Sequence, residues 1–443
     1  MLLVGNGPTI TRDGKNPFYQ DGCVAIDEGI IKETGPCAEL KAKYPGACFV
    51  DAGGNLIMPG FINAHMHFYS TFARGMPGKP GKNPPAQNFD QVLERLWWKL
   101  DKALTLEGVY YSAAAALVDC VKNGCTTVLD HHASPTHVED SLFEIEKAVR
   151  LAGVRASLCY EVSDRDGREI MERGIDENIR FIDHAGGDDM ISGMFGLHAS
   201  FTLSDETLGM CRDKLGSRNA GFHVHVAEGP GDELDSVKRH KKRVVERFRD
   251  FGITGDKSIF VHCIHIDDAE LEIIKETNTS VVHNPESNMG NAVGCAPLLK
   301  MCAAGINVGL GTDGYVSDML QSYKIANALQ KHHNAHPNVA WGEIPAMLFE
   351  NNAKICARHF KTPLGKLAPG YSGDVIVLNY NPPTPLTGDN VNGHLLFGAE
   401  GRCVVTTVAA GKVLMRDGKL TELDETEIYA KAREAAVKVW KEV

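Results

Sequence analysis

The stretch PGFINAHMH (residues 59–67) is a short apolar run that ends in two histidines separated by one residue. Successive side chains of a β-strand point to opposite faces, so residues two apart share a face. His65 and His67 can therefore bind one ion from a single strand end. The alternative, two polar residues on an exposed edge, is disfavoured by the apolar residues before them and by Met66 between them.

Three later stretches repeat this pattern of an apolar run that ends in a histidine or an aspartate. They read HVHVAE (residues 223–228), FVHCIH (residues 260–265) and GLGTDG (residues 309–314). One histidine from each of the first two, with Asp313, would complete a nitrogen and oxygen shell of the kind that zinc takes. Asp313 has an ordinary alternative, since Asp-Gly is a common turn pair. A buried carboxylate is costly, however, unless it is paired or bound to a metal.

The middle of the chain, residues 58–363, alternates strand-like apolar runs with helical patterns such as 106–122 and 141–151. This alternation is typical of a parallel sheet covered on both faces. Eight such units close into a barrel, with the chemistry at the carboxyl ends of the strands. We therefore predict an α/β fold, a (β/α)8 TIM barrel. Its strands should end near His65, Asp130, Tyr160, His198, His225, His262, His283 and Asp313.

The two ends of the chain resemble each other in pattern. Residues 1–57 and the chain from residue 364 onward carry short apolar runs broken by glycine, aspartate and asparagine, which are strand and turn signals. We predict that residues 1–57 and 364–443 form one small β-sandwich domain. Residues 425–443 are rich in alanine, lysine and glutamate and predict a terminal helix within this domain.

Composition excludes several classes of protein. The chain has 443 residues, 43% of them hydrophobic, and a net charge of −11, so no basic face for nucleic acid is expected. The amino terminus has no secretory pattern, and no run approaches the ~18 apolar residues of a membrane helix. Twelve cysteines without a CxxC pair indicate free thiols. A cytoplasmic protein without a membrane partner is the expectation.

Four motifs together resemble the amidohydrolase superfamily, within it the deaminase-like branch of guanine, cytosine and adenosine-type deaminases and triazine hydrolases. They are PGFINAHMHFYSTFARG (residues 59–75), HNPESN (residues 283–288), APLLKMCAAGINVGLGTDG (residues 296–314) and GKLAPGYSGDVIVLN (residues 365–379). The resemblance covers nearly the whole chain. It implies one divalent metal ion, zinc or alternatively iron, because the bridging lysine of two-metal members is missing from the fourth strand (residues 194–198).

The resemblance also assigns roles to single residues. The family's catalytic acid follows its ligand by three positions, so Glu228 selects His225 as the ligand and leaves His223 as a packed or supporting histidine. Asp313 would also carry protons, and His283 would hold the reactive water. The implied metal ligands are His65, His67, His225, His262 and Asp313. His265, one turn beyond His262, is either structural or in contact with the substrate.

Substrate contacts are less sharply indicated. His198 matches the family position near the substrate, and a satisfied strand-end histidine is its alternative. His132 is a second pocket candidate. Arg74 and Asp101 are candidates for the pocket rim, and each could equally be part of a surface ion pair. The stretch 68–104, which includes a loop rich in proline, glycine and lysine at 75–85, is expected to form part of a lid.

The reaction implied by the resemblance is hydrolytic deamination of a purine, pyrimidine or pterin-like heterocycle by metal-activated water. A cyclic-amide hydrolase that opens a ring is the alternative, since it could use the same residues. A non-catalytic barrel is a third hypothesis, which the retained ligand set disfavours. The resemblance further implies a small-molecule substrate and a homo-oligomer, a dimer or larger.

Overall fold

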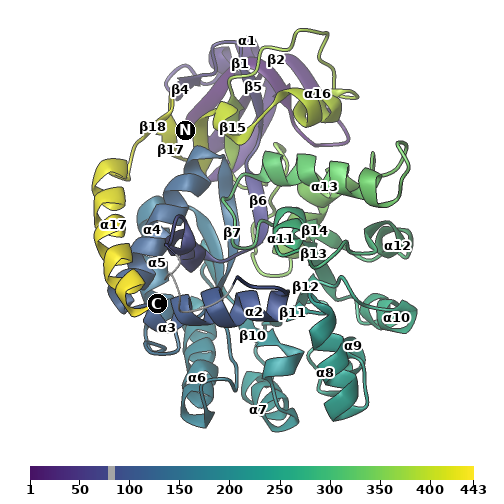
Figure 1. The fold of residues 1–443 in the computed structure, drawn as a ribbon. Helices are drawn as coiled ribbons and strands as arrows, with labels where there is room; N and C mark the ends of the chain where they lie inside the picture. The colour runs from purple at the N-terminus through teal and green to yellow at the C-terminus, as the bar shows by residue number, and fades with distance from the viewer. Residues whose placement is uncertain (78–84) are drawn as a thin grey trace.

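The computed structural model describes residues 1–77 and 85–443. Its larger part is a ring of parallel strands surrounded by helices (Figure 1). One sheet has the order β6-β7-β8-β9 and the other β10-β11-β12-β13-β14. The strands are β6 (Phe61–Met66), β7 (Cys125–His132), β8 (Arg155–Tyr160), β9 (Ile191–Gly193), β10 (Phe195–Ala199), β11 (Phe222–Val226), β12 (Ile259–His262), β13 (Ser280–His283) and β14 (Val308–Leu310).

Backbone hydrogen bonds join the two sheets at both margins. On one side Val162 N donates to Gly196 O at 3.1 Å, and His198 N donates to Val162 O at 3.0 Å. On the other side Asp313 N donates to His65 O at 3.0 Å. Because β9 and β10 are consecutive pieces of one strand, interrupted at Met194, the barrel has eight strand positions. The prediction of a TIM-type barrel is confirmed.

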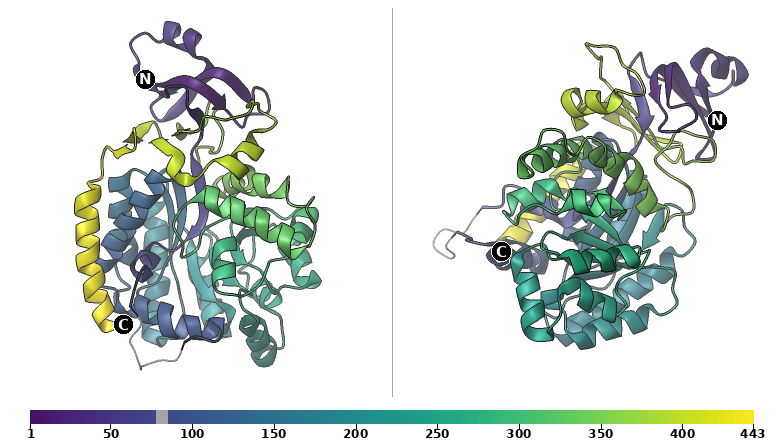
Figure 2. Two further views of the ribbon diagram at one scale, coloured as in Figure 1. Left: turned by 45° about the horizontal axis from the view of Figure 1, so that its top comes forward. Right: turned by 90° about the vertical axis from the view of Figure 1, so that its right-hand side faces the viewer.

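Helices cover the outside of the strands in the predicted alternation (Figure 2). Side chains of Thr105, Ser204 and Asp267 cap the amino ends of α4, α7 and α10. The helices from α4 onward are α4 (Leu106–Lys122), α5 (Ser141–Ala152), α6 (Arg168–Ala185), α7 (Asp205–Leu215), α8 (Pro230–His240), α9 (Val244–Asp250), α10 (Asp268–Glu276), α11 (Pro285–Gly290), α12 (Leu298–Ala303), α13 (Met319–His333), α14 (Glu343–Ala346) and α15 (Asn352–Cys356).

Among the residues described, no single helix has the length and apolarity to cross a membrane. The segment Phe89–Ala103, which contains α2 (Phe89–Val92) and α3 (Trp98–Ala103), passes such a test only together with α4, and the two are bent by 109°. All twelve cysteines are free, and eight of them are buried.

The barrel interior is filled at the end opposite the histidines. A separate apolar cluster draws inward-facing residues from most of the strands and closes on α15. It contains Ile62, Ala64, Leu129, Cys159, Met194, Ile259, Val261, Val282, Ile355, Cys356, Phe360 and Leu364. The barrel is therefore a packed core on one side, and any site must lie at the carboxyl ends of the strands.

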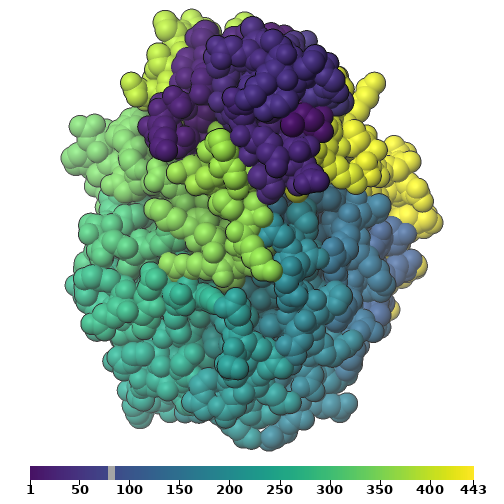
Figure 3. All heavy atoms as spheres, turned by 180° about the vertical axis from the view of Figure 1, so that it is seen from behind, coloured from purple at the N-terminus to yellow at the C-terminus, as the bar shows by residue number. Residues whose placement is uncertain are grey.

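The ends of the chain share one nine-stranded sheet, in the order β18-β17-β16-β15-β5-β1-β2-β3, with β4 paired to β1. Figure 3 shows residues from both ends side by side at one end of the molecule. The elements are β1 (Leu2–Ile10), β2 (Phe18–Asp27), β3 (Ile30–Pro36), α1 (Cys37–Lys43), β4 (Cys48–Asp51), β5 (Leu56–Pro59), β15 (Val375–Leu378), α16 (Val391–Gly398), β16 (Val404–Ala409), β17 (Lys412–Arg416) and β18 (Lys419–Leu420).

The structure differs from the predicted domain limits in two places. Strand β5 extends to Pro59 because it pairs antiparallel with β15, so the sheet takes two residues that were assigned to the barrel. Helix α17 (Glu425–Glu442) lies along α4 of the barrel, where Trp440 Nε1 donates to Phe72 O at 2.7 Å (Figure 1). The division of the chain into a barrel and a terminal β domain otherwise stays a prediction.

A buried ion pair connects the barrel to the nine-stranded sheet. Arg155 begins β8 and is 1% exposed, and its Nη1 lies 2.7 Å from Asp374 Oδ2, just before β15. Asp374→Ala would leave the guanidinium buried without its anion. We expect a loss of about 3–5 kcal/mol in the free energy of unfolding, measured by urea denaturation. Glu422→Ala, which breaks an exposed pair with Lys412, is the control and should have a much smaller effect.

Candidate metal centre and pocket

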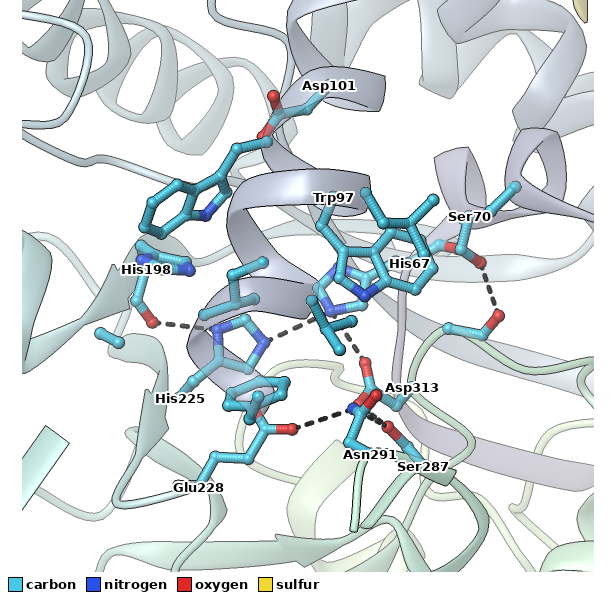
Figure 4. A pocket seen from close by; sticks show the side chains of 18 of the residues that line it. His67, Ser70, Trp97, Asp101, His198, His225, Glu228, Ser287, Asn291 and Asp313 are labelled. Carbon is cyan, nitrogen blue, oxygen red and sulfur yellow. Dashed lines mark hydrogen bonds and ion pairs between the residues drawn. The ribbon is translucent and has the colours of Figure 1, made fainter. Parts of the chain in front are cut away.

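Four predicted ligands converge at the carboxyl end of the barrel. The ligand atoms of His65, His67, His225 and Asp313 all lie within 4.8 Å of one another, and the four residues are buried. His67 Nε2 is 3.0 Å from Asp313 Oδ1 and 3.3 Å from His225 Nε2 (Figure 4). His65 Nε2 is 3.6 Å from the same carboxylate oxygen. Three imidazoles and one carboxylate are a donor set that suits a four-coordinate zinc ion.

Hydrogen bonds fix which nitrogen of each histidine faces the cluster. His67 Nδ1 lies 2.6 Å from His131 O, and His225 Nδ1 lies 2.9 Å from His198 O. A carbonyl oxygen only accepts, so each Nδ1 carries the hydrogen and each Nε2 keeps its lone pair. His65 Nδ1 contacts His223 Nε2 at 2.9 Å, while its Nε2 is buried with no hydrogen-bond partner. The lone pairs therefore meet where a cation would bind.

The electrostatics of the cluster also favour positive charge. Burial opposes protonation of His67, but a hydrogen bond to Asp313 and the charge of that carboxylate raise the pKa of His67 to about 9, so a second hydrogen, on Nε2, would occupy the position that a bound cation takes. Burial likewise opposes ionisation of Asp313, yet the neighbouring His65 and His67 hold its pKa well below the usual range. Ser287 Oγ donates to Asp313 Oδ2 at 2.6 Å. Asp313 is thus a carboxylate that attracts a cation.

Irregular backbone brings these side chains together. The register of β6 against β7 shifts between Asn63 and Met66, which turns His65 and His67 toward the barrel interior. Asp313 has a φ of +55°, and His262 has a φ of +73°. Left-handed backbone is costly for residues other than glycine and is concentrated at functional sites. At both strand ends it redirects a side chain that regular alternation would point elsewhere.

His262, which we predicted as a fifth ligand, lies outside the group of four. Its Nδ1 contacts Asn288 Oδ1 at 2.8 Å, which leaves the lone pair on Nε2. That nitrogen is 3.4 Å from Glu228 Oε2 and 3.7 Å from Asp313 Oδ2. The position of His262 between two carboxylates suits a partner of water or substrate better than a ligand of the ion.

Glu228, the predicted catalytic acid, lies beside His262 at the wall of the cavity. Asn291 Nδ2 donates to its Oε1 at 3.4 Å (Figure 4). Burial and the nearby charge of Asp313 raise the pKa of Glu228 well above its usual range. A carboxyl group with a raised pKa keeps its proton to higher pH and can donate it to a substrate.

The structure does not support the predicted role of His283. Val282, the residue before it, belongs to the apolar cluster inside the barrel, and His283 has no left-handed backbone to reverse the alternation. Its side chain therefore shares a face with Val281, which packs in the outer core. Neither ring nitrogen has a hydrogen-bond partner, and among the residues described no ion pair joins it to Glu228 or Asp313.

A cavity of about 430 Å³ lies over the cluster and has aromatic walls. Its lining includes Tyr69, Phe89, Trp97, Trp98 and Phe201, together with His67, His225, Glu228 and Asp313. Several of these residues come from the stretch 68–104 that was expected to form a lid. Residues 78–84 of that stretch, with most of its proline- and glycine-rich loop, lie outside the described residues.

The four predicted substrate contacts fall in different places. His198 lines the cavity, with Nδ1 2.7 Å from Thr202 Oγ1. Arg74 and Asp101 also line it, but Arg74 pairs with Asp119 and Asp101 with Arg165. His132 is not among the lining residues, because its ring turns into the wall and contacts Ser134 Oγ at 2.9 Å.

Two residues near the cluster were not singled out from the sequence as site residues. Glu161 follows β8 directly and lines the cavity, and Arg165 lies four residues further on, before α6 begins. Neither belongs to a motif that we recognised. The only available signal was position, since Glu161 follows a predicted strand end at Tyr160. The role of His223 was indicated by the sequence, because Glu228 selects His225 as the ligand and leaves His223 as a packed or supporting histidine. In the structure His223 contacts His65.

Known proteins that resemble this chain identify its family. The sequence pattern of the amidohydrolase family matches residues 56–414. The chain belongs to the amidohydrolase family. It is 31% identical over 442 residues to the 5'-deoxyadenosine deaminase of Methanosarcina mazei, covering 98% of this chain and 97% of that one. It is 30% identical to the 5-methylthioadenosine/S-adenosylhomocysteine deaminase of Syntrophomonas wolfei, covering 99% of both chains.

A solved structure supports the fold of this amidohydrolase. The adenosine deaminase from Xanthomonas campestris with bound zinc superposes with a TM-score of 0.87 at 22% identity, covering 99% of this chain and 98% of that one. The predicted membership of the deaminase-like branch is confirmed by these relatives. The amidohydrolase is thus a hydrolase of C–N bonds other than peptide bonds, with a His and Asp cluster of metal-binding type.

Proposed function

We propose that this amidohydrolase deaminates a flat nitrogen heterocycle by hydrolysis. The observation that carries the proposal is the convergence of His65, His67, His225 and Asp313 beneath a cavity whose wall also holds Glu228 and His262. We propose that the four hold one divalent ion, zinc, with iron(II) as the alternative. Strand β10 has no lysine that could bridge a second ion, which supports a single one.

The residues divide the proton transfers between them. A divalent ion at this site would lower the pKa of a bound water toward ~7. His262 Nε2 would accept a hydrogen bond from the attacking water and so orient it. Asp313 would accept the proton that this water loses and pass it to the departing amine. Glu228 would donate its proton to the ring nitrogen next to the attacked carbon, so that negative charge does not develop there.

The walls of the cavity indicate the shape of the substrate. Aromatic side chains such as Trp97, Phe89 and Phe201 favour a flat ring. The volume of about 430 Å³ is of the size usual for small-molecule sites. The relatives named as deaminases of adenosine derivatives point to purines, and the sequence motifs allow pyrimidines and pterins as well.

An ammonia-release screen tests the proposal. The purified protein would be offered amino-purines, amino-pyrimidines, pterins and cyclic ureides, beside quantification of bound metal. We expect about one equivalent of metal per chain and stoichiometric ammonia from at least one amino-heterocycle. New carboxylate without ammonia would instead show ring opening, and a protein that takes up no metal would contradict the assigned ligands.

The proposal extends to assembly. We propose a homo-oligomer, a dimer or larger, on the ground of the family resemblance. Light scattering coupled to size-exclusion chromatography would measure the mass of the particle, and a mass equal to one chain would contradict it.

A further inference from the structure

Glu161 is a buried carboxylate in the cavity that the proposed proton transfers do not use. It directly follows β8, and its side chain is 4% exposed. It is one of the residues that line the cavity, so what exposure it has faces the substrate space. A charged group is costly to bury unless partners stabilise it, so the partners of Glu161 indicate its role.

Three groups keep this carboxylate ionised. Glu161 Oε2 lies 3.2 Å from His131 Nδ1, and Oε1 lies 3.7 Å from Arg165 Nη2. Burial would raise the pKa of Glu161, but its neighbours His198, His131 and Arg165 outweigh burial and hold it well below the usual range. Asp101 pairs with Arg165, so the network also fixes the guanidinium. Glu161 therefore accepts hydrogen bonds and donates none.

His198 adds a second acceptor beside it. His198 Nδ1 contacts Thr202 Oγ1 at 2.7 Å, and that hydroxyl in turn donates to Ala199 O at 3.1 Å. The hydroxyl hydrogen is thus committed, so His198 Nδ1 must donate and its Nε2 carries the lone pair. This Nε2 lies 3.8 Å from Glu161 Oε1. Two acceptors thus lie side by side at the cavity wall, where one donor group of a ligand could approach both.

This acceptor pair, Glu161 and His198, lies at a different part of the metal-type cluster from Glu228. The ligand atoms of Glu161 and His198 group with His225, whereas those of Glu228 group with His262 and Asp313. The two carboxyl groups also differ in surroundings, since burial and the nearby Asp313 raise the pKa of Glu228, whereas the neighbours of Glu161 hold its pKa well below the usual range. Environments that separate two carboxyl groups in this way usually assign them different roles.

The chemistry of the substrate follows from these two positions. An amino-bearing ring carbon has two ring neighbours. If Glu228 protonates a bare ring nitrogen on one side, the neighbour on the other side faces the acceptor pair. A ring N–H at that position would donate a hydrogen bond to Glu161. A bare ring nitrogen would instead place its lone pair against the lone pairs of the Glu161 carboxylate, which is repulsive. We propose that Glu161, with His198, selects heterocycles whose amino-bearing carbon lies between a bare ring nitrogen and a ring N–H, as in 2-amino-4-oxo pyrimidines, pterins and guanine.

This inference rests on the proposed function for its orientation of the ring, and it names the substrate class of the same site. Guanine and 2-aminopurine make a suitable probe pair. Both carry an amino group on C2, but only guanine has a hydrogen on the neighbouring N1. Isocytosine and 2-aminopyrimidine repeat the comparison on a single ring. The quantities compared are kcat/KM for ammonia release and the dissociation constant from calorimetry on metal-depleted protein.

Glu161→Gln keeps the size of the side chain and replaces one acceptor oxygen by an NH2 donor. We expect the wild type to prefer guanine over 2-aminopurine, and the variant to lose about 10- to 100-fold of that preference in both measurements. Glu161→Asp, which keeps the charge, should retain the preference in part. Glu146→Gln is the matched control, since Glu146 is buried and paired with Arg150 away from the cavity, and it should leave the ratio unchanged.

The outcomes separate this inference from the proposed function. A preference in binding that Glu161→Gln removes, without ammonia release from any probe, would refute deamination and keep the assignment of Glu161. Equal binding of both probes by the wild type, or binding of neither, would overturn the assignment even if another heterocycle is deaminated. The wild-type comparison decides the matter if the variant does not fold.

Discussion

Asp313→Asn should remove both the bound metal and the activity, with kcat/KM falling about 10,000-fold, near the upper end of what one acid–base group contributes. Asp313 is the only carboxylate among the four converging side chains, and its Oδ1 is 3.0 Å from His67 Nε2. Asparagine has nearly the same volume and can still accept the hydrogen bond from Ser287. The fold should therefore survive, while the negative charge that attracts the ion and accepts the proton is lost.

The measurement is metal content by mass spectrometry beside steady-state kinetics on whichever heterocycle the ammonia screen identifies. Asp318→Asn is the control, because Asp318 lies five residues further along and caps α13 by accepting from Gln321 N at 2.9 Å. It should keep full metal content. If Asp313→Asn binds metal as tightly as the wild type, the ion is not held by this group of four.

The parts of the site that were predictable are those that depend on local sequence. His65 and His67 share a face because they are two apart in a strand, and β6 and β11 end where their apolar runs end. The order of strands and helices follows from the alternation of patterns, so the barrel was predictable as well. The supporting role of His223 followed from the choice of His225 as ligand, and its contact with His65 agrees.

The parts that were not predictable depend on backbone irregularity or on distant contacts. His262 and His283 both end apolar strands, and only the left-handed φ of His262 turns its ring toward the cluster. No pattern in the sequence predicts this left-handed conformation at His262. Glu161 gains its role from His131, His198 and Arg165, two of which lie on other strands. A sequence shows neither pairing, so Glu161 looked like any polar residue after a strand.

The ends of the chain illustrate the same limit. The strand signals in both terminal segments were visible, but the pairing of β5 with β15 joins residues about three hundred positions apart and sets where the sheet ends. The terminal helix was predicted as an element, whereas its packing on the barrel depends on partners such as Phe72 and Glu107 that lie far away in the chain. Element identity is local, and the docking of elements is not.

Glu228→Gln should lower kcat by about 100- to 1,000-fold and leave metal content unchanged. Glutamine preserves the shape of the side chain and its contact with Asn291, but it has no acidic proton for the ring nitrogen. Burial and the nearby Asp313 raise the pKa of the Glu228 carboxyl well above the usual range. The acid form is present below that raised pKa, so wild-type kcat should fall as pH rises through it.

In Glu228→Gln this loss of kcat at high pH should disappear, since the group that titrates is gone. The pH profile of kcat, measured for both proteins with one substrate, checks the assignment independently of the size of the rate loss. Asp232→Asn supplies a comparison, because Asp232 is another buried carboxyl on the cavity wall that serves the backbone by accepting from Ala227 N at 2.9 Å. A variant Glu228→Gln that keeps wild-type kcat, or that retains the same high-pH limb, would mean that the proton reaches the ring from another group.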